Sequence, residues 1–337
     1  MIPLLLTDRS ISLRYLVHKH LLDSDEAGEL KEQRLNDPIV KKLIKLQRPD
    51  GSWDATGITG NAPQGKVQTT SQALTRLGYL ELDPEHKSIK KGVEYLFSSQ
   101  ERDGSWPLGN YRTDADGQDN YDVMSLQTSL PLRGIASTGH EEDPRAETAY
   151  DWLIDQRLDD GSWPTGKASG VNGYVAGYRR MPHSRWGCRS NTTAALTCLS
   201  MHPERARSYE VRRAFDLLLG GETRERHHIG FDMARTVGAE ESTGFITYHA
   251  RFDLAHMLKL CSRIGASVDD PRVREMVDFV VEARNQYGLW EYTKPQVSRW
   301  VTYDLLRSLG EVGVDDDWVG MEPRTPFQPY PKRRKRF

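Results

Sequence analysis

Basic residues stand close to the starts of several predicted helices and could together bind an anion. They are Arg14, Lys66, Arg189, Arg251 and Arg299. Guanidinium groups match the geometry of phosphate and carboxylate, and the amino ends of helices carry partial positive charge. The pattern favours an anionic headgroup site in which Arg189, Arg251 and Arg299 are the main contacts. The alternative is that these cations pair with the many Asp and Glu residues of the loops.

Aromatic residues lie near the same helix starts. They are Trp186, Tyr248, Trp300 and Tyr303. A cavity lined by aromatic rings suits an apolar chain or a cationic intermediate. Together with the arginines, these residues predict a small-molecule ligand that has an anionic head and an apolar body. The alternative is ordinary packing between helices.

Three aspartates are candidate acids. Asp253 and Asp304 each lie one turn into a predicted helix, and Asp116 stands in the acid-rich loop 113–122. A positioned carboxyl group can donate a proton, and clustered carboxylates can hold Mg²⁺. The alternative for Asp116 is a polar loop that caps the next helix.

A repeated motif organises the elements that must position these side chains. The segment Gln47–Trp53 recurs at 100–106 and, one residue longer, at 156–163, with a worn copy at 286–290. Its Asp-Gly pair is a turn in which Gly takes positive φ, and its Gln can satisfy backbone groups at a helix end. Its Trp presents a large apolar face to the neighbouring repeat. We therefore interpret the motif as a structural clasp between repeats.

This motif resembles the QW motif of the terpene cyclase and protein prenyltransferase superfamily, and the chain is similar to squalene-cyclase-like repeat proteins. The resemblance implies an all-α fold, a single α/α toroid in which an inner ring of helices stands inside an outer ring. It also implies an isoprenoid-type enzyme, cyclase or prenyltransferase, that binds an anionic prenyl substrate in the central cavity. Two other functions stay open: a ligand-binding or scaffold toroid, and a toroid enzyme that acts on a saccharide or peptide.

The same resemblance bears on a metal. Protein prenyltransferases bind zinc through an Asp-x-Cys at one inner-helix start and a His at the next, and Cys188 and His249 match this pattern. Trp186 stands where the Asp would be, and a catalytic zinc needs three protein ligands. A structural Cys and His are the alternative to a Zn²⁺ pair. The DxDD motif with which class II terpene cyclases protonate an alkene does not occur in the sequence.

Helical periodicity predicts two sets of helices. The outer set is expected at 38–47, 86–100, 144–156, 208–219 and 271–285, and the inner set at 11–22, 69–80, 121–137, 191–201, 250–264 and 298–309. Links from inner to outer helices are short, whereas links from outer to inner helices are long. Since long loops are usually either functional or disordered, we predict the ligand mouth at the amino ends of the inner helices.

Composition limits the class of protein and its setting. A net charge of −2 and a pI near 6.6 give no argument for a nucleic-acid binder, and a mean hydropathy of −0.66 predicts no membrane span. Three cysteines without paired spacing favour a reducing, cytoplasmic setting. We predict a toroid domain at 1–314 and a proline-rich basic tail at 315–337. The tail is either a solvated extension or an electrostatic contact with anionic lipid or nucleic acid.

Overall fold

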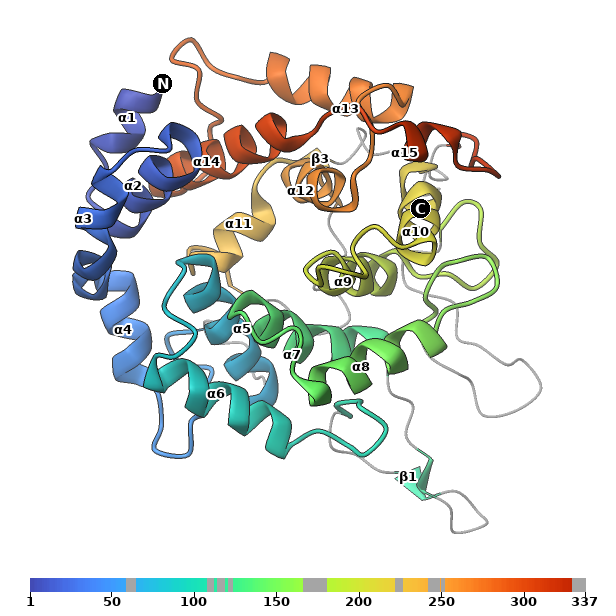
Figure 1. The fold of residues 1–337 in the computed structure, drawn as a ribbon, viewed down its shortest axis with the longest axis horizontal. Helices are drawn as coiled ribbons and strands as arrows, with labels where there is room; N and C mark the ends of the chain where they lie inside the picture. The colour runs from blue at the N-terminus through green and yellow to red at the C-terminus, as the bar shows by residue number, and fades with distance from the viewer. Residues whose placement is uncertain are drawn as a thin grey trace, which may run out of the picture.

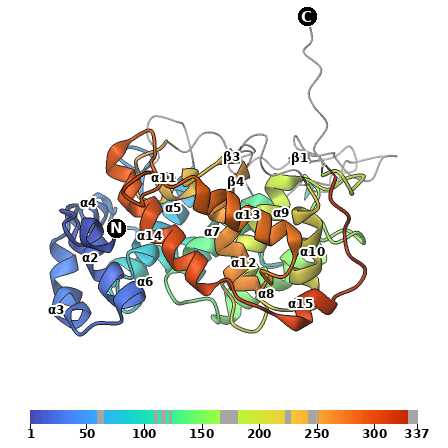
Figure 2. The same ribbon diagram turned by 90° about the horizontal axis from the view of Figure 1, so that it is seen from above.

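The computed structural model describes residues 1–58, 65–107, 112–113, 119–120, 124–165, 181–221, 227–241, 249 and 252–328. Helices in two concentric layers form a ring, shown in Figure 1 along its axis and in Figure 2 from the side. The fold is an α/α toroid, and this confirms the predicted fold class. Within the described residues, the strands form only two-residue pairings: β1 (Arg112–Thr113) with β2 (Asp119–Asn120), and β3 (His227–His228) with β4 (Phe252–Asp253). Two isolated bridges join Pro164 to Gly187 and Gly221 to Gln328.

The inner ring carries most of the residues that face the centre. Its helices are α5 (Lys66–Tyr79), α7 (Ser125–Ser137), α9 (Arg189–Leu199), α12 (Leu254–Ile264) and α14 (Pro295–Glu311). The short helix α11 (Phe231–Thr236) contacts both α14 and α5, and it lies on the inner side of the ring (Figure 1). Because other helices flank the inner helices, many serine and threonine side chains of the inner helices are buried.

The outer ring follows the predicted helices closely. It consists of α4 (Pro38–Leu46), α6 (Lys87–Ser98), α8 (Pro144–Asp155), α10 (Tyr209–Leu219) and α13 (Pro271–Glu282). Three of them begin with an aspartate cap followed by proline: the carboxylates of Asp37, Asp143 and Asp270 accept backbone N–H groups of the first turn. Such caps satisfy orphan donors and fix where each helix starts.

The first predicted inner helix lies elsewhere. Residues 11–22 form α2 (Ile11–Val17) and the wider turns of η1 (His18–Leu22), and they sit at the edge of the molecule with α1 (Ile2–Leu6) and α3 (Glu26–Gln33) (Figure 1). The apolar face of Leu13, Leu16 and Val17 is buried, and α2 contacts α14. The inner helix α11 comes instead from a segment that we expect to be a loop. The prediction of an inner helix at 11–22 is therefore wrong.

The repeated motif forms a clasp between repeats, seen clearly in the copy at 100–106. The indole Nε1 of Trp106 donates to the carbonyl oxygen of Leu96 at the end of α6, at 2.7 Å, and Gln100 donates to Gly104 and Arg145 carbonyls. Gly104 has φ +93°, and a Cβ there would lie 2.5 Å from the carbonyl oxygen of Thr148, so only glycine fits. The interpretation of the motif as a clasp is confirmed by these contacts.

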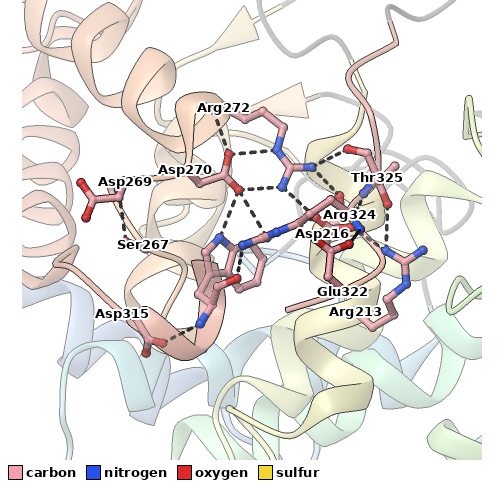
Figure 3. Close-up of polar contacts among 11 residues, drawn as sticks. Arg213, Asp216, Ser267, Asp269, Asp270, Arg272, Asp315, Glu322, Arg324 and Thr325 are labelled. Carbon is pink, nitrogen blue, oxygen red and sulfur yellow. Dashed lines mark hydrogen bonds and ion pairs between the residues drawn. The ribbon is translucent and has the colours of Figure 1, made fainter. Parts of the chain in front are cut away.

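The C-terminal strap, residues 315–328, packs across the outer ring (Figure 3). It contains α15 (Asp316–Gly320), whose Trp318 is fully buried and donates its indole N–H to Asp270 at 3.1 Å. The backbone N–H of Thr325 donates to Asp216 on α10 at 2.9 Å. The predicted alternative of a solvated extension from residue 315 onward is therefore wrong for the strap, because Trp318 and these bonds hold it to α10 and α13. The basic run 332–336 lies outside the described residues.

Candidate functional site

A central cavity of about 320 Å³ opens between the carboxyl-terminal halves of the inner helices. It is lined mostly by charged and hydroxyl side chains, with Tyr79 from α5 among them. The inner helices point their carboxyl ends into this end of the ring, where partial negative charge favours cations. The described cavity therefore lies at the end opposite to the predicted mouth.

The carboxylates of this cavity are each paired with a cation. Asp304 on α14 lies 2.6 Å from Nζ of Lys259 on α12, and the Nε of Arg307 donates to Glu311 at 3.0 Å. Glu81, which follows α5, binds Lys19 and His20 of the first helices. Both signs of charge are therefore present, and each acid is neutralised locally.

A buried ion cluster forms the inner wall of the cavity. Arg133 on α7 reaches Asp232 on α11 at 2.8 Å, and Arg235 and His256 approach the same carboxylate at 3.0 and 3.3 Å. Burial disfavours the charged carboxylate, but Arg133 and His256 outweigh it and hold the pKa of Asp232 well below its usual value. Asp232 is therefore the anion that joins α7, α11 and α12 at the centre.

Arg263 differs from the other cations of the cavity. Burial and the neighbouring charges of Arg133 and Arg307 lower its pKa to about 10, while the carboxylates of Asp304 and Glu311 act in the opposite direction. Among the described residues, no hydrogen bond or ion pair within 4.0 Å engages its guanidinium group. Arg263 is thus a cation of the cavity wall that has no hydrogen-bond or ion-pair partner among the described residues.

A much smaller cavity of about 10 Å³ lies nearer the amino ends of the inner helices, and Arg189 and Asp253 contribute to its wall. Asp253 caps α12, and its two oxygens accept the backbone N–H groups of Gly230, Asp232 and Ala255. Burial raises the pKa of this carboxyl group, although the N–H groups of Asp232 and Gly230 oppose the rise. Asp253 is therefore both a structural clamp on α11 and an acid with a raised pKa.

The proposed metal pair is buried. Cys188 precedes α9, and its backbone N–H donates to the carbonyl oxygen of Trp163 at 2.8 Å. His249 stacks on His256 with ring centroids 5.5 Å apart, and burial together with Arg235 holds its pKa well below the usual value. No group of three or more His, Cys, Asp or Glu residues in the described ranges is arranged to hold a metal ion. Zinc or magnesium stays a prediction, which elemental analysis of the purified protein would test.

The other predicted site residues are dispersed. Arg299 binds Asp8 at 3.2 Å, Trp300 packs against Tyr79 at 6.1 Å between ring centroids, and Tyr303 is buried in the core. Trp186 is partly exposed beneath the guanidinium of Arg185. Arg299 and the three rings line none of the cavities above. Three further candidates lie outside the described residues: Asp116, Tyr248 and Arg251.

A second hollow adjoins the central cavity. A groove of about 610 Å³ runs between the α2–α3 region and the carboxyl ends of α5 and α7. It shares Gly78, Glu81 and Ser137 with the central cavity, and Ala27, Leu82 and Pro84 give it apolar wall. The two hollows are therefore adjacent, and the groove has the more apolar wall.

Sequence reasoning missed this end of the ring. A usable signal was present, since a basic residue recurs in the carboxyl-terminal half of several inner helices: Arg76, Arg133, Arg263 and Arg307. A cation at a helix start suggests a ligand site because that end attracts anions, whereas a cation at a helix end is normally explained by its favourable interaction with the partial negative charge of that end.

No helix of the described residues is both long and apolar enough to cross a membrane.

Comparison with known proteins gives two kinds of match. Residues 21–180 match the family model of the squalene-hopene cyclase C-terminal domain. A squalene–hopene cyclase of Zymomonas mobilis is 28% identical over 142 residues, which are 40% of this chain and 21% of that protein. A probable squalene–hopene cyclase of Sinorhizobium fredii is 28% identical over 126 residues, 37% of this chain and 19% of its own length. The chain thus spans about a fifth of the length of these relatives.

Among solved structures, the apo type II terpene cyclase MstE from Scytonema is similar in shape. It aligns with a TM-score of 0.48 at 17% identity, and the match covers 86% of this chain and 74% of that one. A substituted form of the same cyclase, in complex with its substrate geranylgeranyl dihydroxybenzoate, aligns with a TM-score of 0.46 at 16% identity, covering 82% of this chain and 71% of that one.

Proposed function

Because the chain is terpene cyclase-like, we propose that it is an isoprenoid-type enzyme that holds its substrate inside the inner ring. The match of residues 21–180 to the squalene-hopene cyclase C-terminal domain and the QW-like repeats support this class. The observation that carries the proposal is the cavity of about 320 Å³ enclosed by the inner helices. Ligand sites in proteins are typically concave hollows of this order.

The walls of the two hollows bear on the substrate. The central cavity of about 320 Å³ is lined mostly by charged and hydroxyl side chains, whereas the adjacent groove of about 610 Å³ has apolar wall from Ala27, Leu82 and Pro84. We therefore propose an isoprenoid with a polar end, of geranyl or farnesyl length, whose polar end lies in the cavity and whose chain lies in the groove.

Asp304 is the acid that we propose for the chemistry, because it lines the central cavity, where it pairs with Lys259 at 2.6 Å. A positioned carboxyl group can exchange a proton with a bound substrate. Asp253 lines the separate cavity of about 10 Å³, and its two oxygens accept the backbone N–H groups of Gly230, Asp232 and Ala255. We therefore assign Asp253 to holding α11 in place.

A second candidate is a toroid that binds a polar ligand such as a saccharide. The charged and hydroxyl lining of the central cavity favours it, because an apolar chain placed there would leave buried polar groups without partners. The two candidates differ in which compound stabilises the protein.

The test combines thermal shift and product analysis on the full chain. Farnesol, geraniol, squalene and a disaccharide are each added, and we expect the two shorter prenols to raise the melting temperature while squalene does not. Incubation with farnesyl and geranyl substrates is followed by mass spectrometry, and Asp304→Asn should abolish any product, with Asp151→Asn on the exposed face of α8 as the matched control. Stabilisation by the disaccharide alone would favour the second candidate.

A further inference from the structure

We propose that Arg263 marks an anion site at the carboxyl end of the inner ring, which binds a phosphate-type oxyanion. The site lies in the central cavity with Tyr79, Lys259 and Arg307. It rests on the proposed function only in sharing that cavity, because an anion could occupy it without any isoprenoid chain. It lies at the end opposite to the arginines that the sequence singles out.

The balance of charge in the cavity supports the site. Each lining carboxylate has its own cation: Asp304 has Lys259, Glu311 has Arg307, and Glu81 has Lys19 and His20. Arg133 on the wall is held by Asp232. After these pairs are made, Arg263 is left without a close carboxylate among the described residues. An added anion would therefore neutralise a charge instead of competing for one.

A hydroxyl group on the wall of the same cavity also has no hydrogen-bond partner among the described residues. The hydroxyl of Tyr79 has almost no solvent exposure and no hydrogen-bond partner among the described residues, although Tyr79 lines the same cavity. The ammonium of Lys259 stands 5.2 Å from the centre of the Tyr79 ring. A buried hydroxyl without a partner is costly, so a bound acceptor would satisfy it. Two residues with donors of different kinds thus belong to the wall of one cavity.

The chemistry of the donors favours an oxyanion with several oxygens. A guanidinium group presents parallel N–H donors that match two oxygens of a phosphate, whereas a halide would use one. Burial lowers the pKa of Arg263, and repulsion from Arg133 and Arg307 lowers it further, so an anion between these groups would relieve that repulsion. A diphosphate offers enough acceptor oxygens for Arg263, Tyr79 and Lys259 together.

Arg263 could also act only by stabilising the carboxyl end of α12, and this role must be distinguished from anion binding. Arg263 lies in the last turn of α12, where a cation stabilises the helix by complementing its partial negative charge. That role needs no ligand, and it would be seen as a loss of stability on substitution with no change in anion affinity. Binding of an anion by the wild-type chain is therefore the deciding observation.

The experiment is isothermal titration of the full chain with inorganic pyrophosphate and orthophosphate, beside neutral farnesol. We expect pyrophosphate to bind, and Arg263→Gln to weaken that binding about tenfold or more, the range of one hydrogen bond to a charged group. Tyr79→Phe should weaken it less, and Arg263→Lys should retain part of it. Arg274→Gln is the matched control. Arg274 lies on α13, where it pairs with the exposed Asp269 before that helix, so this substitution should leave the affinity for pyrophosphate unchanged.

The outcomes separate the two proposals. No heat with either phosphate, or equal affinity for pyrophosphate in wild type and Arg263→Gln, would overturn the anion site. Farnesol binding in either case would leave the isoprenoid proposal standing. Pyrophosphate binding that depends on Arg263, without farnesol binding, would support the anion site and count against the isoprenoid substrate. If Arg263→Gln does not fold, Arg263→Lys and Tyr79→Phe decide by the same criterion.

Discussion

The backbone N–H of Trp106 donates to the hydroxyl oxygen of Thr128 at 3.2 Å, and this bond fastens a loop of the outer ring to the inner helix α7. The same bond recurs in the other copies of the motif: Trp53 with Thr70, Trp163 with Thr192 and Trp290 with Thr302. In each copy the indole also donates to a carbonyl oxygen ten residues earlier, at the end of the outer helix. Each tryptophan therefore joins one outer helix to the inner helix that follows it.

Removal of one of these tryptophans should lower stability strongly. Trp106→Ala deletes a side chain that is 2% exposed and its bond to Leu96, so we expect a loss of about 3–5 kcal/mol. Chemical unfolding followed by circular dichroism measures it. Trp152→Ala on α8 is the control, because Trp152 is partly exposed and should cost less. Equal losses for the two variants would contradict a special role for the motif.

The threonine partner offers a smaller and more specific test. Thr128→Val keeps the shape of the side chain but leaves the backbone N–H of Trp106 buried without an acceptor, at a cost of about 1–3 kcal/mol. Thr148→Val, on the exposed face of α8, should change stability by less than about 0.5 kcal/mol. A Thr128→Val protein that melts with the wild type would show that the bond contributes nothing.

Acid should weaken the contact of the first helices with the ring. Burial raises the pKa of Glu81, but the bonds from His20 and Lys19 outweigh it and lower the pKa to about 2, against 4.5 for an ordinary Glu. A lowered folded-state pKa adds stability above the unfolded value, and this stability disappears as pH falls from about 4.5 towards 2. Glu81→Gln should thus flatten the loss of stability across that interval. Unfolding curves at several pH values decide, and identical slopes would refute the assignment.

Truncation tests the strap. A chain that ends at Val314 loses buried Trp318 and leaves Asp216 and Asp270 without Arg324 and the N–H of Thr325, so we expect it to lose about 3–5 kcal/mol. A chain that ends at Gln328 keeps all of these contacts and should melt close to the full chain. The comparison uses thermal melts of both truncations. Similar melting temperatures for both would mean that residues 1–314 form a self-sufficient domain.

The sequence predicts features that depend on a repeated pattern, but it does not predict contacts between residues that are far apart in the chain. Trp53, Trp106 and Trp163 recur with Asp-Gly, so a repeat architecture and its outer helices could be predicted from spacing, whereas the ring was implied by the resemblance to the QW-motif superfamily. The threonines that receive their N–H groups follow at variable distances and carry no motif. Arg299 was assigned to a ligand from its place at a helix start, yet its carboxylate is Asp8, 291 residues away. Pairing across such separations depends on ring closure, which local periodicity does not contain.

Arg263 and Asp253 show the same limit at the site. The sequence places both on one helix, and it identifies Asp253 as an acid, but the N–H groups that clamp Asp253 come from Gly230 and Asp232 in a segment that we expect to be a loop. Arg263 is distinctive only because Asp304 and Glu311 already have partners. The unpaired positive charge of Arg263 depends on all the ion pairs of the cavity, so it could not be predicted from the type of any single residue.

The bond from each tryptophan to its threonine has a consequence for how such chains can diverge. The two partners lie 12, 17, 22 and 29 residues apart in the four copies, yet the bond stays between 3.1 and 3.2 Å. The intervening stretch can therefore lengthen by more than a helical turn's worth of residues while the junction at its two ends keeps its geometry. Since every such stretch begins at an outer helix and returns to the amino end of an inner helix, the differences in length among the four copies fall on one face of the ring. The short links lie at the opposite rim, which is also where the central cavity opens.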